Sequence, residues 1–285
     1  SRHLKSFIEA FNPRVTVIVP NYNHSQFLNK RLDSIYQQTY KNFNVILLDD
    51  ASSDNSRAIL NEYAGHYSEI TKTFFNEKNS GSTFLQWKKG IELADSDIVW
   101  IAESDDFCDK NFLEVLVPFF MDEAVYLAYA KSVFIGIDNQ PVTFSFDHYL
   151  SEIDSKKWLA DYVEFAHNEV VNALGKKNTI PNVSSVLFRK PQNCSLFMDD
   201  FWLNMKICGD WVFYLYLIRG AKLGFTNRTL NYFRFHSANS SAKTYQKSIY
   251  YEEHEHVART IAKLYKVPDE TLDIHQKFVK RFWEH

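Results

Sequence analysis

The apolar positions before residue 120 follow two alternating patterns. Short apolar runs rich in β-branched residues predict buried strands at 14–20, 43–50, 70–76 and 97–103. Apolar residues at helical spacing fill the segments between them, at 24–40, 53–67 and 82–94. Strands that alternate with helices of this length are typical of a parallel sheet covered on both faces. The pattern therefore predicts a doubly wound α/β half over residues 14–120.

The pattern becomes less regular after residue 120. It predicts strands at 124–130, 131–144, 183–190, 222–227 and 230–236, with a turn around Asp138 and Asn139. Apolar spacing predicts a helix at 210–220 that Gly220 closes, and a helical end from Tyr245. Residues 151–180 have poor periodicity, which predicts short helices and a loop.

These elements predict one large domain with two appendages. An amphipathic lead-in helix is expected over residues 1–13, and a C-terminal helical extension over 241–285. The domain itself spans 14–240, with a nucleotide-binding half at 14–120 and an acceptor or catalytic half at 121–240. The expected fold class is α/β, with a mixed, mostly parallel sheet flanked by helices.

Composition and charge exclude several classes of protein. A formal net charge of -3 offers no basic excess of the kind that extended nucleic-acid binding uses. Three scattered cysteines suggest neither a disulfide framework nor a zinc cluster, so a reducing compartment, the cytoplasm, is expected. No apolar stretch is long enough to span a bilayer.

Acidic and polar residues follow three of the predicted strands. The stretches are 20–23 (PNYN), 49–54 (DDASSD) and 103–106 (ESDD). In open parallel sheets, ligands bind where the carboxyl ends of strands meet, and crowded carboxylates need a cation or hydrogen-bond donors to offset their repulsion. Mg²⁺ or Mn²⁺ would suit these oxygen ligands and implies a phosphate-bearing ligand. Helix capping by Asp105 or Asp109 is the alternative.

No GxGxxG and no GxxxxGK[ST] follows any predicted strand, so neither a dehydrogenase-type dinucleotide site nor a P-loop is supported. Four stretches in order instead resemble the motifs of inverting family 2 glycosyltransferases with the GT-A fold, of the kind that builds bacterial surface polysaccharides. They are VTVIVPNYN with the following NVILLDDASSDNS, then NSGSTFLQWKKG with DIVWIAESDD, then GDWVFYLYLIRG, and finally YFRFH. The resemblance covers residues 14–240.

The resemblance implies a nucleotide site at the first two strand ends. Pro20 and Tyr22 are expected to border the base and ribose. Asp50 resembles the residue that accepts a hydrogen bond from a ring N–H, which suits uracil, and Asp49 is the weaker candidate. Lys88 is a candidate phosphate contact, although a solvated lysine on a helix is the favoured interpretation.

The resemblance also implies a metal site in ESDD, which matches a DxD-type motif. Asp106 and Asp105 rank above Glu103 as ligands of Mn²⁺ or Mg²⁺, and Asp105 is also placed against the donor. His236 resembles a histidine that completes the metal site or contacts phosphate in some relatives. The structural alternative for a lone histidine after a strand stays open.

Asp210, in CGDW, resembles the catalytic base. A carboxylate near an acceptor hydroxyl can remove its proton as the oxygen attacks the sugar's anomeric carbon, and one displacement inverts that carbon. The alternative is that Asp210 caps the helix that follows it.

The implied function is metal-dependent inverting transfer of a sugar from a nucleoside diphosphate, favoured as UDP, to a hydroxyl of a glycan or lipid-linked acceptor. A magnesium-dependent phosphoryl-transfer enzyme and a non-catalytic nucleotide-sugar-binding domain are the alternatives. The Ser-rich segment 236–244 is expected to close over the donor. Residues 275–283 mix basic and aromatic residues as in helices on anionic membranes, which would place the protein at the inner face of the membrane. Packing of these aromatics on the core or on a partner subunit of a homo-oligomer is favoured.

Overall fold

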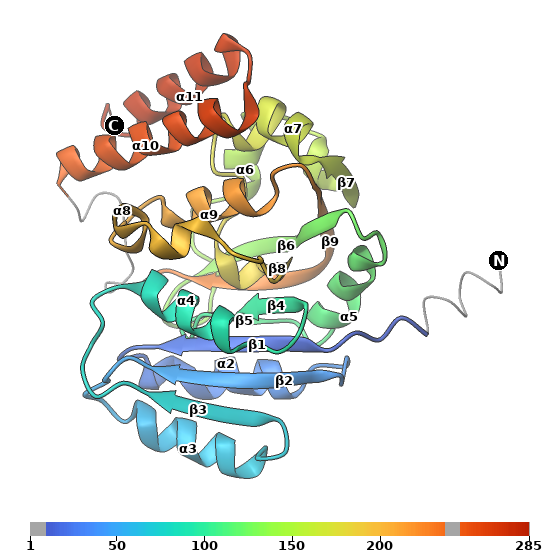
Figure 1. Cartoon of the computed structure of the whole chain (residues 1–285), viewed down its shortest axis with the longest axis vertical. Coiled ribbons are helices and arrows are strands. Elements are labelled where there is room, and N and C mark those ends of the chain that lie inside the picture. The colour runs from blue at the N-terminus through green and yellow to red at the C-terminus, as the bar shows by residue number, and fades with distance from the viewer. Residues whose placement is uncertain (1–9, 237–245, 285) are drawn as a thin grey trace.

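The computed structural model describes residues 10–236 and 246–284 (Figure 1). Residues 1–9 of the predicted lead-in helix and 237–244 of the predicted closing segment lie outside the described residues. Residues 11–13 of the lead-in segment are not helical.

The first half has the predicted alternation of strands and helices. Its elements are β1 (Val15–Asn21), α2 (Ser25–Tyr36), β2 (Phe43–Asp49), α3 (Ser56–His66), β3 (Thr71–Phe75), α4 (Thr83–Leu93) and β4 (Ile98–Ile101). The four strands pair in parallel in the order β3-β2-β1-β4. Each apolar run has therefore become a parallel strand, buried in β1, β2 and β4 and only partly buried in β3.

The second half extends the same sheet with mixed strand directions. Its strands are β5 (Phe107–Cys108), β6 (Val125–Ile135), β7 (Tyr162–Phe165), β8 (Val186–Arg189) and β9 (Lys222–Arg234). The order continues β4-β8-β6-β9-β5, and β7 pairs with β9. β8 is antiparallel to both of its neighbours, whereas β6 and β9 are parallel. The prediction of a mixed sheet flanked by helices is confirmed.

Helices of the second half are mostly short. They are α5 (Phe112–Leu116), α6 (Phe146–Ser151), α7 (Ala166–Glu169), α8 (Asp200–Leu203) and α9 (Gly209–Leu217), with single turns between them. The chain ends in α10 (Lys247–Tyr265) and α11 (Asp269–Arg281). Among the described residues, no helix is long and apolar enough to cross a bilayer.

Two predicted strand pairs are wrong in detail. The segments 124–130 and 131–144 contain one strand, β6, and the segments 222–227 and 230–236 contain another, β9. The two strands pair along their length, but the partner of Ala130 is Thr226 and the partner of Lys131 is Leu230. Residues 227–229, between the two segments predicted as strands, form a bulge in β9. The strand stays continuous, but its pairing register with β6 shifts at this point.

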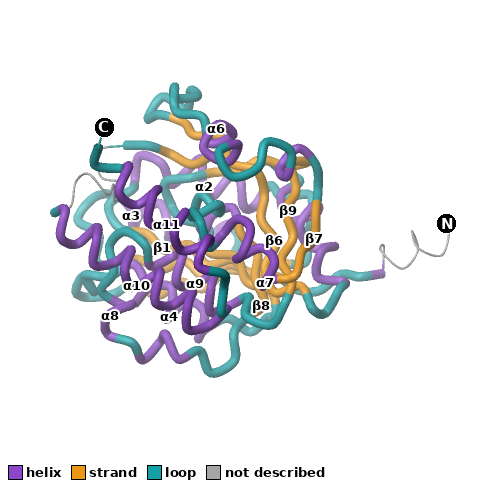
Figure 2. Tube along the Cα trace, turned by 90° about the horizontal axis from the view of Figure 1, so that it is seen from above, coloured by secondary structure: helices purple, strands orange, loops and turns teal. Residues whose placement is uncertain are grey.

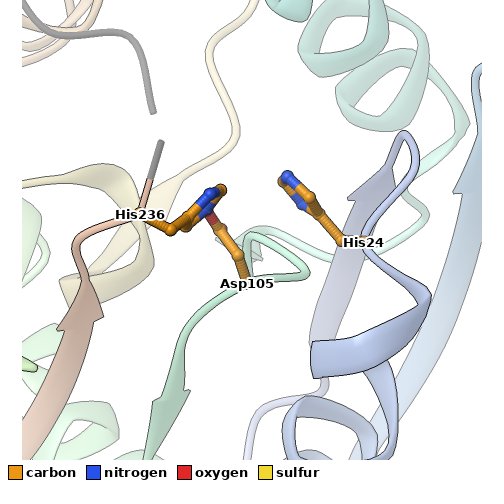
Figure 3. Close-up of side chains that lie close together, drawn as sticks. All are labelled: His24, Asp105 and His236. Atoms are coloured by element: carbon orange, nitrogen blue, oxygen red, sulfur yellow. The ribbon is translucent and has the colours of Figure 1, made fainter. Parts of the chain in front are cut away.

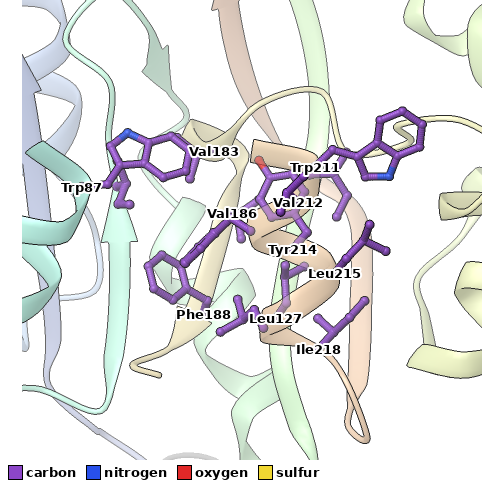
Figure 4. Packing of buried hydrophobic residues seen from close by; sticks show 14 of the residues in the cluster. Trp87, Leu127, Val183, Val186, Phe188, Trp211, Val212, Tyr214, Leu215 and Ile218 are labelled. Carbon is purple, nitrogen blue, oxygen red and sulfur yellow. The ribbon is translucent and has the colours of Figure 1, made fainter. Parts of the chain in front are cut away.

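The two faces of the sheet carry separate cores. In β1, Val15, Val17 and Val19 face one core while Ile18 faces the other, as expected for a strand buried on both sides. Helices α2 and α5 contribute to the core on the first face, and α4, α9 and α10 contribute to the core on the second. Figure 2 shows α9 and α10 next to each other on one side of the strands. Figure 4 shows residues of α9 packed on β6 and β8 in the second core.

The terminal helices pack on the domain. Val257, Ile261 and Tyr265 of α10 are buried in the same core as α9. The rings of Phe282 and Trp283 lie 4.8 and 5.5 Å from the ring of Tyr250, also on α10. These two aromatic side chains therefore pack on the protein, as in the favoured interpretation of residues 275–283.

Candidate active site

Three loops that follow parallel strands meet at one edge of the sheet. β1, β2 and β4 run in the same direction, and Asn21 lies opposite Asp49 in the register. The loops after them carry the three polar stretches that the sequence singles out. The side-chain amide of Asn21 donates to Asp49 Oδ1 at 2.9 Å, and His24 Nδ1 lies 2.9 Å from Ser104 Oγ. All three loops are thus joined by direct contacts.

Asp49 is a structural carboxylate. It is fully buried and accepts hydrogen bonds from the amide of Asn21 and from Ser52 Oγ, at 2.9 and 2.6 Å. Its Oδ2 forms an ion pair with Arg57 Nε at 3.0 Å. These contacts hold the loop that follows β2 in place.

Asp50 faces a different set of partners, in the loop before α4. Its Oδ1 accepts from Asn76 Nδ2 and from the Ser80 amide, both at 2.8 Å, and its Oδ2 accepts from Ser80 Oγ at 2.7 Å. A carboxylate has about four acceptor positions, so Oδ2 retains one. Ala51, the next residue, has a φ of 61°, a left-handed conformation that non-glycine residues rarely adopt.

The loop after β1 presents its side chains to solvent. Pro20 is half-buried and Tyr22 is 48% exposed. Asn23 has a φ of 54°, and its Oδ1 accepts the Ser53 amide at 2.8 Å. Asn23 therefore shapes the turn, and the exposed side chain of Tyr22 is available to a ligand.

Lys88 lies on the surface of α4, where its Nζ is 4.0 Å from Glu92 one turn later. The adjacent Lys89 instead donates to Asn76 Oδ1 at 2.7 Å, beside Asp50. The structure thus brings Lys89, and not Lys88, to the loop that Asp50 organises.

His24, Asp105 and His236 form a compact cluster of metal-ligating groups (Figure 3). One ligand atom from each lies within 4.8 Å of the others, and His236 Nε2 is 2.8 Å from Asp105 Oδ2. His24 is the residue before α2, Asp105 follows β4, and His236 follows β9. Burial opposes the charged form of Asp105, but the hydrogen bond with His236 and the nearby histidine charges outweigh it and lower its pKa.

The donor set of this cluster fits a divalent cation. Two imidazole nitrogens and one carboxylate oxygen suit Mn²⁺, whereas Mg²⁺ prefers oxygen ligands alone. Burial also lowers the pKa of His24, which favours the neutral imidazole that binds metals. A cation held here would lie between the first and third loops, with coordination positions left for phosphate oxygens.

Asp106, ranked first among the metal ligands from sequence, lies outside this cluster. Its Oδ2 accepts from Asn182 Nδ2 at 2.6 Å, and its Oδ1 accepts the Arg234 amide at 2.9 Å. Burial and the neighbouring charge of Asp105 raise the pKa of Asp106 to about 7. These two contacts connect the loop of residues 103–106, called the acid loop below, to β9 and to the segment before β8.

Glu103 is held by donors from two helices. Trp87 Nε1 donates to its Oε1 at 3.2 Å, and Nε of the fully buried Arg31 donates to its backbone oxygen at 2.9 Å. Burial, with the charges of Asp105 and Asp106, raises the pKa of Glu103 to about 8. A carboxyl group that is protonated at neutral pH reduces the repulsion among the three acids.

Asp210 lies in the first turn of α9, whose N-cap is Cys208, so Asp210 is not the capping residue. Its Oδ1 accepts the Trp211 amide at 2.7 Å, and its Oδ2 lies 3.5 Å from Asn178 Nδ2. Burial raises the pKa of Asp210 to about 7. A buried carboxyl group that ionises near neutrality is suited to accept a proton.

Segment 178–182 connects Asp210 to the acid loop. Asn178 is the side-chain neighbour of Asp210, while Asn182, at the other end of the segment, donates to Asp106. Asn231 Nδ2 also lies 3.1 Å from Asn182 Oδ1 and anchors this end to β9. The candidate base and the loop that carries Asp105 and Asp106 therefore contact opposite ends of the same short segment.

A family model described as Glycosyl transferase family 2 matches residues 16–180, more than half of the chain. The chain belongs to glycosyl transferase family 2. The match ends just before Asn182, so Asp210 and His236 lie beyond it.

Relatives in this family match over the same part of the chain. A putative teichuronic acid biosynthesis glycosyltransferase of Bacillus subtilis is 28% identical over 132 residues, which is 46% of this chain and 52% of that protein. The chain thus spans about half the length of this relative.

Solved structures share the fold over nearly the whole chain. Staphylococcus aureus TarS 1-349 in complex with UDP-GlcNAc matches 95% of this chain and 73% of its own, at 18% identity and a TM-score of 0.68. A mannosyltransferase from Pyrobaculum calidifontis in complex with GDP-Man and Mn²⁺ matches 95% of this chain and 70% of its own, at 16% identity and a TM-score of 0.60. The GT-A fold inferred from the sequence motifs is confirmed.

Three residues of the candidate site in this family 2 member were not predicted from the sequence: His24, Asn182 and Lys89. His24 directly follows the PNYN stretch, so the sequence does place a metal-ligating side chain next to a predicted strand end. Asn182 and Lys89 gave none, because their importance depends on contacts with Asp106 and Asn76 that spacing does not reveal.

Proposed function

We propose that this chain transfers a sugar from a nucleoside diphosphate sugar, with uridine as the favoured nucleoside, to a hydroxyl of a glycan or lipid-linked acceptor, with inversion at the anomeric carbon and with Mn²⁺ or Mg²⁺ as cofactor. The observation that carries the proposal is the segment 178–182, which borders both Asp210 and the acid loop that contributes Asp105. This arrangement brings a candidate base close to a candidate diphosphate site.

Asp50 is the residue proposed to bind the base. Its carboxylate is buried and oriented by Asn76 and Ser80, and one acceptor position of Oδ2 remains for a ring N–H. Tyr22 and Pro20, on the neighbouring loop, would border the nucleoside. The same Asp50 contacts fix the loop before α4, so base binding and loop order are coupled.

His24, Asp105 and His236 are the residues proposed to hold the cation. A divalent cation bound there supplies Lewis-acid stabilisation of the charge that develops on the departing diphosphate. His236 and Asp105 already form a hydrogen bond, so the protein holds these two side chains in place.

Asp210 is proposed to take the proton of the acceptor hydroxyl. The hydroxyl oxygen at the same time bonds to the anomeric carbon of the sugar, and the bond from that carbon to the diphosphate breaks. The burial that raises its pKa makes it a stronger base than an exposed aspartate once it is ionised. The Trp211 amide fixes Oδ1 and leaves Oδ2, beside Asn178, for the acceptor.

Two comparisons support the substrate classes. TarS 1-349 was solved with UDP-GlcNAc, and the relative from Bacillus subtilis is named for teichuronic acid biosynthesis. A uridine nucleotide and a cell-envelope glycan are therefore the first donor and acceptor to examine.

The test is a screen of UDP, GDP, UDP-sugars and GDP-mannose, each with and without Mn²⁺, by thermal shift and by release of the nucleoside diphosphate. A ligand that binds only the folded state raises its apparent stability. We expect a Mn²⁺-dependent shift with one nucleotide, loss of that shift in Asp50→Ala, and retained binding with lost turnover in Asp210→Asn.

Four results would contradict the proposal. No Mn²⁺-dependent shift with any nucleotide would remove the donor site. Full turnover of Asp210→Asn would remove the base. Formation of a covalent aspartyl phosphate would favour the phosphoryl-transfer alternative, and nucleotide-sugar binding without turnover on any tested glycan would favour a binding domain.

A further inference from the structure

Glu253, on the C-terminal helix α10, makes an unusual set of contacts close to Asp210. The side chain is 3% exposed, and its carboxylate accepts three consecutive backbone amides. The Lys206 amide donates to Oε1 at 2.6 Å, and the amides of Ile207 and Cys208 donate to Oε2 at 2.8 Å each. Glu253 thus binds the chain immediately before α9.

No side-chain cation forms an ion pair with Glu253 within the part of the chain that the structure describes. A buried carboxylate without such a partner is costly unless hydrogen bonds compensate for its lost hydration. Three charge-assisted bonds from backbone amides provide that compensation and are stronger than neutral ones. The contact is therefore specific to a carboxylate in this position.

The segment that Glu253 binds determines where Asp210 lies. Cys208 is the N-cap of α9 and has no side-chain cap of its own, and Asp210 is two residues later. The next residue, Gly209, packs so closely on α4 that a Cβ there would come within 2.2 Å of the Phe84 ring. The start of α9 is thus fixed from α10 on one side and from α4 on another.

α10 also holds the other end of α9. The Tyr265 hydroxyl donates to the backbone oxygen of Leu215, and Val257 and Ile261 are buried in the core that α9 shares. Contacts at both ends prevent α9 from sliding along or rotating against the sheet.

We propose that Glu253 is a positioning residue for the catalytic base, and that α10 is consequently part of the catalytic unit and not an appendage to it. The inference rests on the proposed function, because it requires Asp210 to be the base.

The test compares Glu253→Gln with Glu255→Gln. Glu255 lies on the same helix, is exposed and pairs with Arg259 at i,i+4, so its variant matches the chemistry without the amide contacts. A glutamine at 253 places an NH₂ group against backbone N–H donors and cannot accept all three bonds. We expect kcat of Glu253→Gln to fall at least tenfold while KM for the donor stays within twofold, and Glu255→Gln to match the wild type.

A pH profile separates positioning from a loss of folded protein. The groups that face Asp210 are Cys208, Tyr149, Tyr214 and Glu253, and the charge of Glu253 contributes to the raised pKa of Asp210. Removing that charge should move the acid limb of kcat/KM to lower pH. A smaller fraction of folded enzyme would lower the whole profile without moving it.

If Glu253→Gln does not fold, Glu253→Asp retains the charge with a shorter side chain and should give a reduced kcat with the acid limb unmoved. Wild-type kcat in Glu253→Gln, or equal losses in donor affinity and kcat, would overturn the inference. A wild-type enzyme without turnover would instead reject the proposed function, so the two failures are distinguishable.

Discussion

His236 Nε2 lies 2.8 Å from Asp105 Oδ2, although 131 positions separate the two residues in the chain. The contact joins the end of β9 to the loop after β4, next to His24 at the start of α2. Three segments that are distant in sequence therefore contribute one nitrogen or oxygen ligand each to one small volume.

This geometry predicts that His24 is a metal ligand. We expect His24→Ala to raise the Mn²⁺ concentration needed for half-maximal UDP-dependent stabilisation by about 10- to 100-fold, the usual effect of weakening a metal site. Asp105→Asn should abolish the dependence on Mn²⁺. Titration of Mn²⁺ at saturating UDP, followed by thermal shift, measures both.

His66 provides the control for this experiment, because it is an exposed histidine at the end of α3. His66→Ala should require the same Mn²⁺ concentration as the wild type. Equal Mn²⁺ requirements of His24→Ala and His66→Ala would exclude His24 from the site.

The pH dependence of catalysis follows from Asp210. A base must be ionised to accept a proton, and the pKa of Asp210 is raised to about 7, so kcat/KM should fall as pH decreases below about 7 and level off above it. Asp210→Asn should lose about 10²- to 10⁴-fold in kcat. The exposed Asp200 is the control, and Asp200→Asn should keep the wild-type profile.

The same raised pKa predicts an effect on stability. The folded state binds the Asp210 proton more tightly than the unfolded state, whose pKa is near 3.8, so this group lowers stability as pH rises from about 4 to about 7. Asp210→Asn removes that loss. Relative to the wild type, its free energy of unfolding should therefore be higher at pH 8 than at pH 5, by about 1 kcal/mol or more. Urea unfolding at both pH values measures the difference, and equal differences would contradict the raised pKa.

Asp49 and Asp50 are adjacent but should respond differently to loss of charge. Asp49→Asn disturbs a buried carboxylate with several donors, so we expect the free energy of unfolding to fall by about 2 kcal/mol, with part of the Arg57 pair screened by solvent. Asp50→Asn should weaken UDP binding about tenfold or more. Chemical unfolding and UDP titration of both variants test the division, and it fails if both lose only stability.

Ala51, next to Asp50, has a strained backbone conformation. Its φ of 61° costs a non-glycine residue about 1–2 kcal/mol, and glycine recovers part of this after its own entropic cost. Ala51→Gly should therefore stabilise the protein by roughly 0.5–1 kcal/mol. Ala58→Gly, at an exposed position inside α3, should destabilise it by about 1 kcal/mol. Effects of the same sign in the two variants would contradict the strain at Ala51.

The sequence predicted the first half of the fold well because β1, β2 and β4 are buried on both faces and each reads as one apolar run. β6 and β9 were divided wrongly because a bulge and a turn use the same polar residues, and only the partner strand distinguishes them. β5 was missed because two residues carry no pattern, and β7 was missed because its residues are half-buried or exposed and form no apolar run.

The candidate site shows the same limit. The strand ends placed Asp50 and Asp105 at the same edge of the sheet, whereas Asp210, in the first turn of α9, was assigned from the resemblance. The partners of these carboxylates were not predictable, because contacts such as that of Asn182 with Asp106 join residues far apart in the chain. The same holds for Glu253, which accepts three backbone amides 45 to 47 positions away. The rank of Asp106 as first metal ligand likewise came from the resemblance, whereas in the structure its oxygens accept bonds from Asn182 and β9.

The segment 178–182 also bears on how such enzymes can be recombined. The family-matching region ends at residue 180, inside this segment, so a chimera joined there would take Asn178 from one parent and Asn182 from the other. Asn178 lies beside Asp210, and Asn182 donates to Asp106. The two parents would therefore supply mismatched side chains at the candidate active site. A junction before β6, near Asp122, would transfer the segment, α9 and α10 together as one exchangeable cassette.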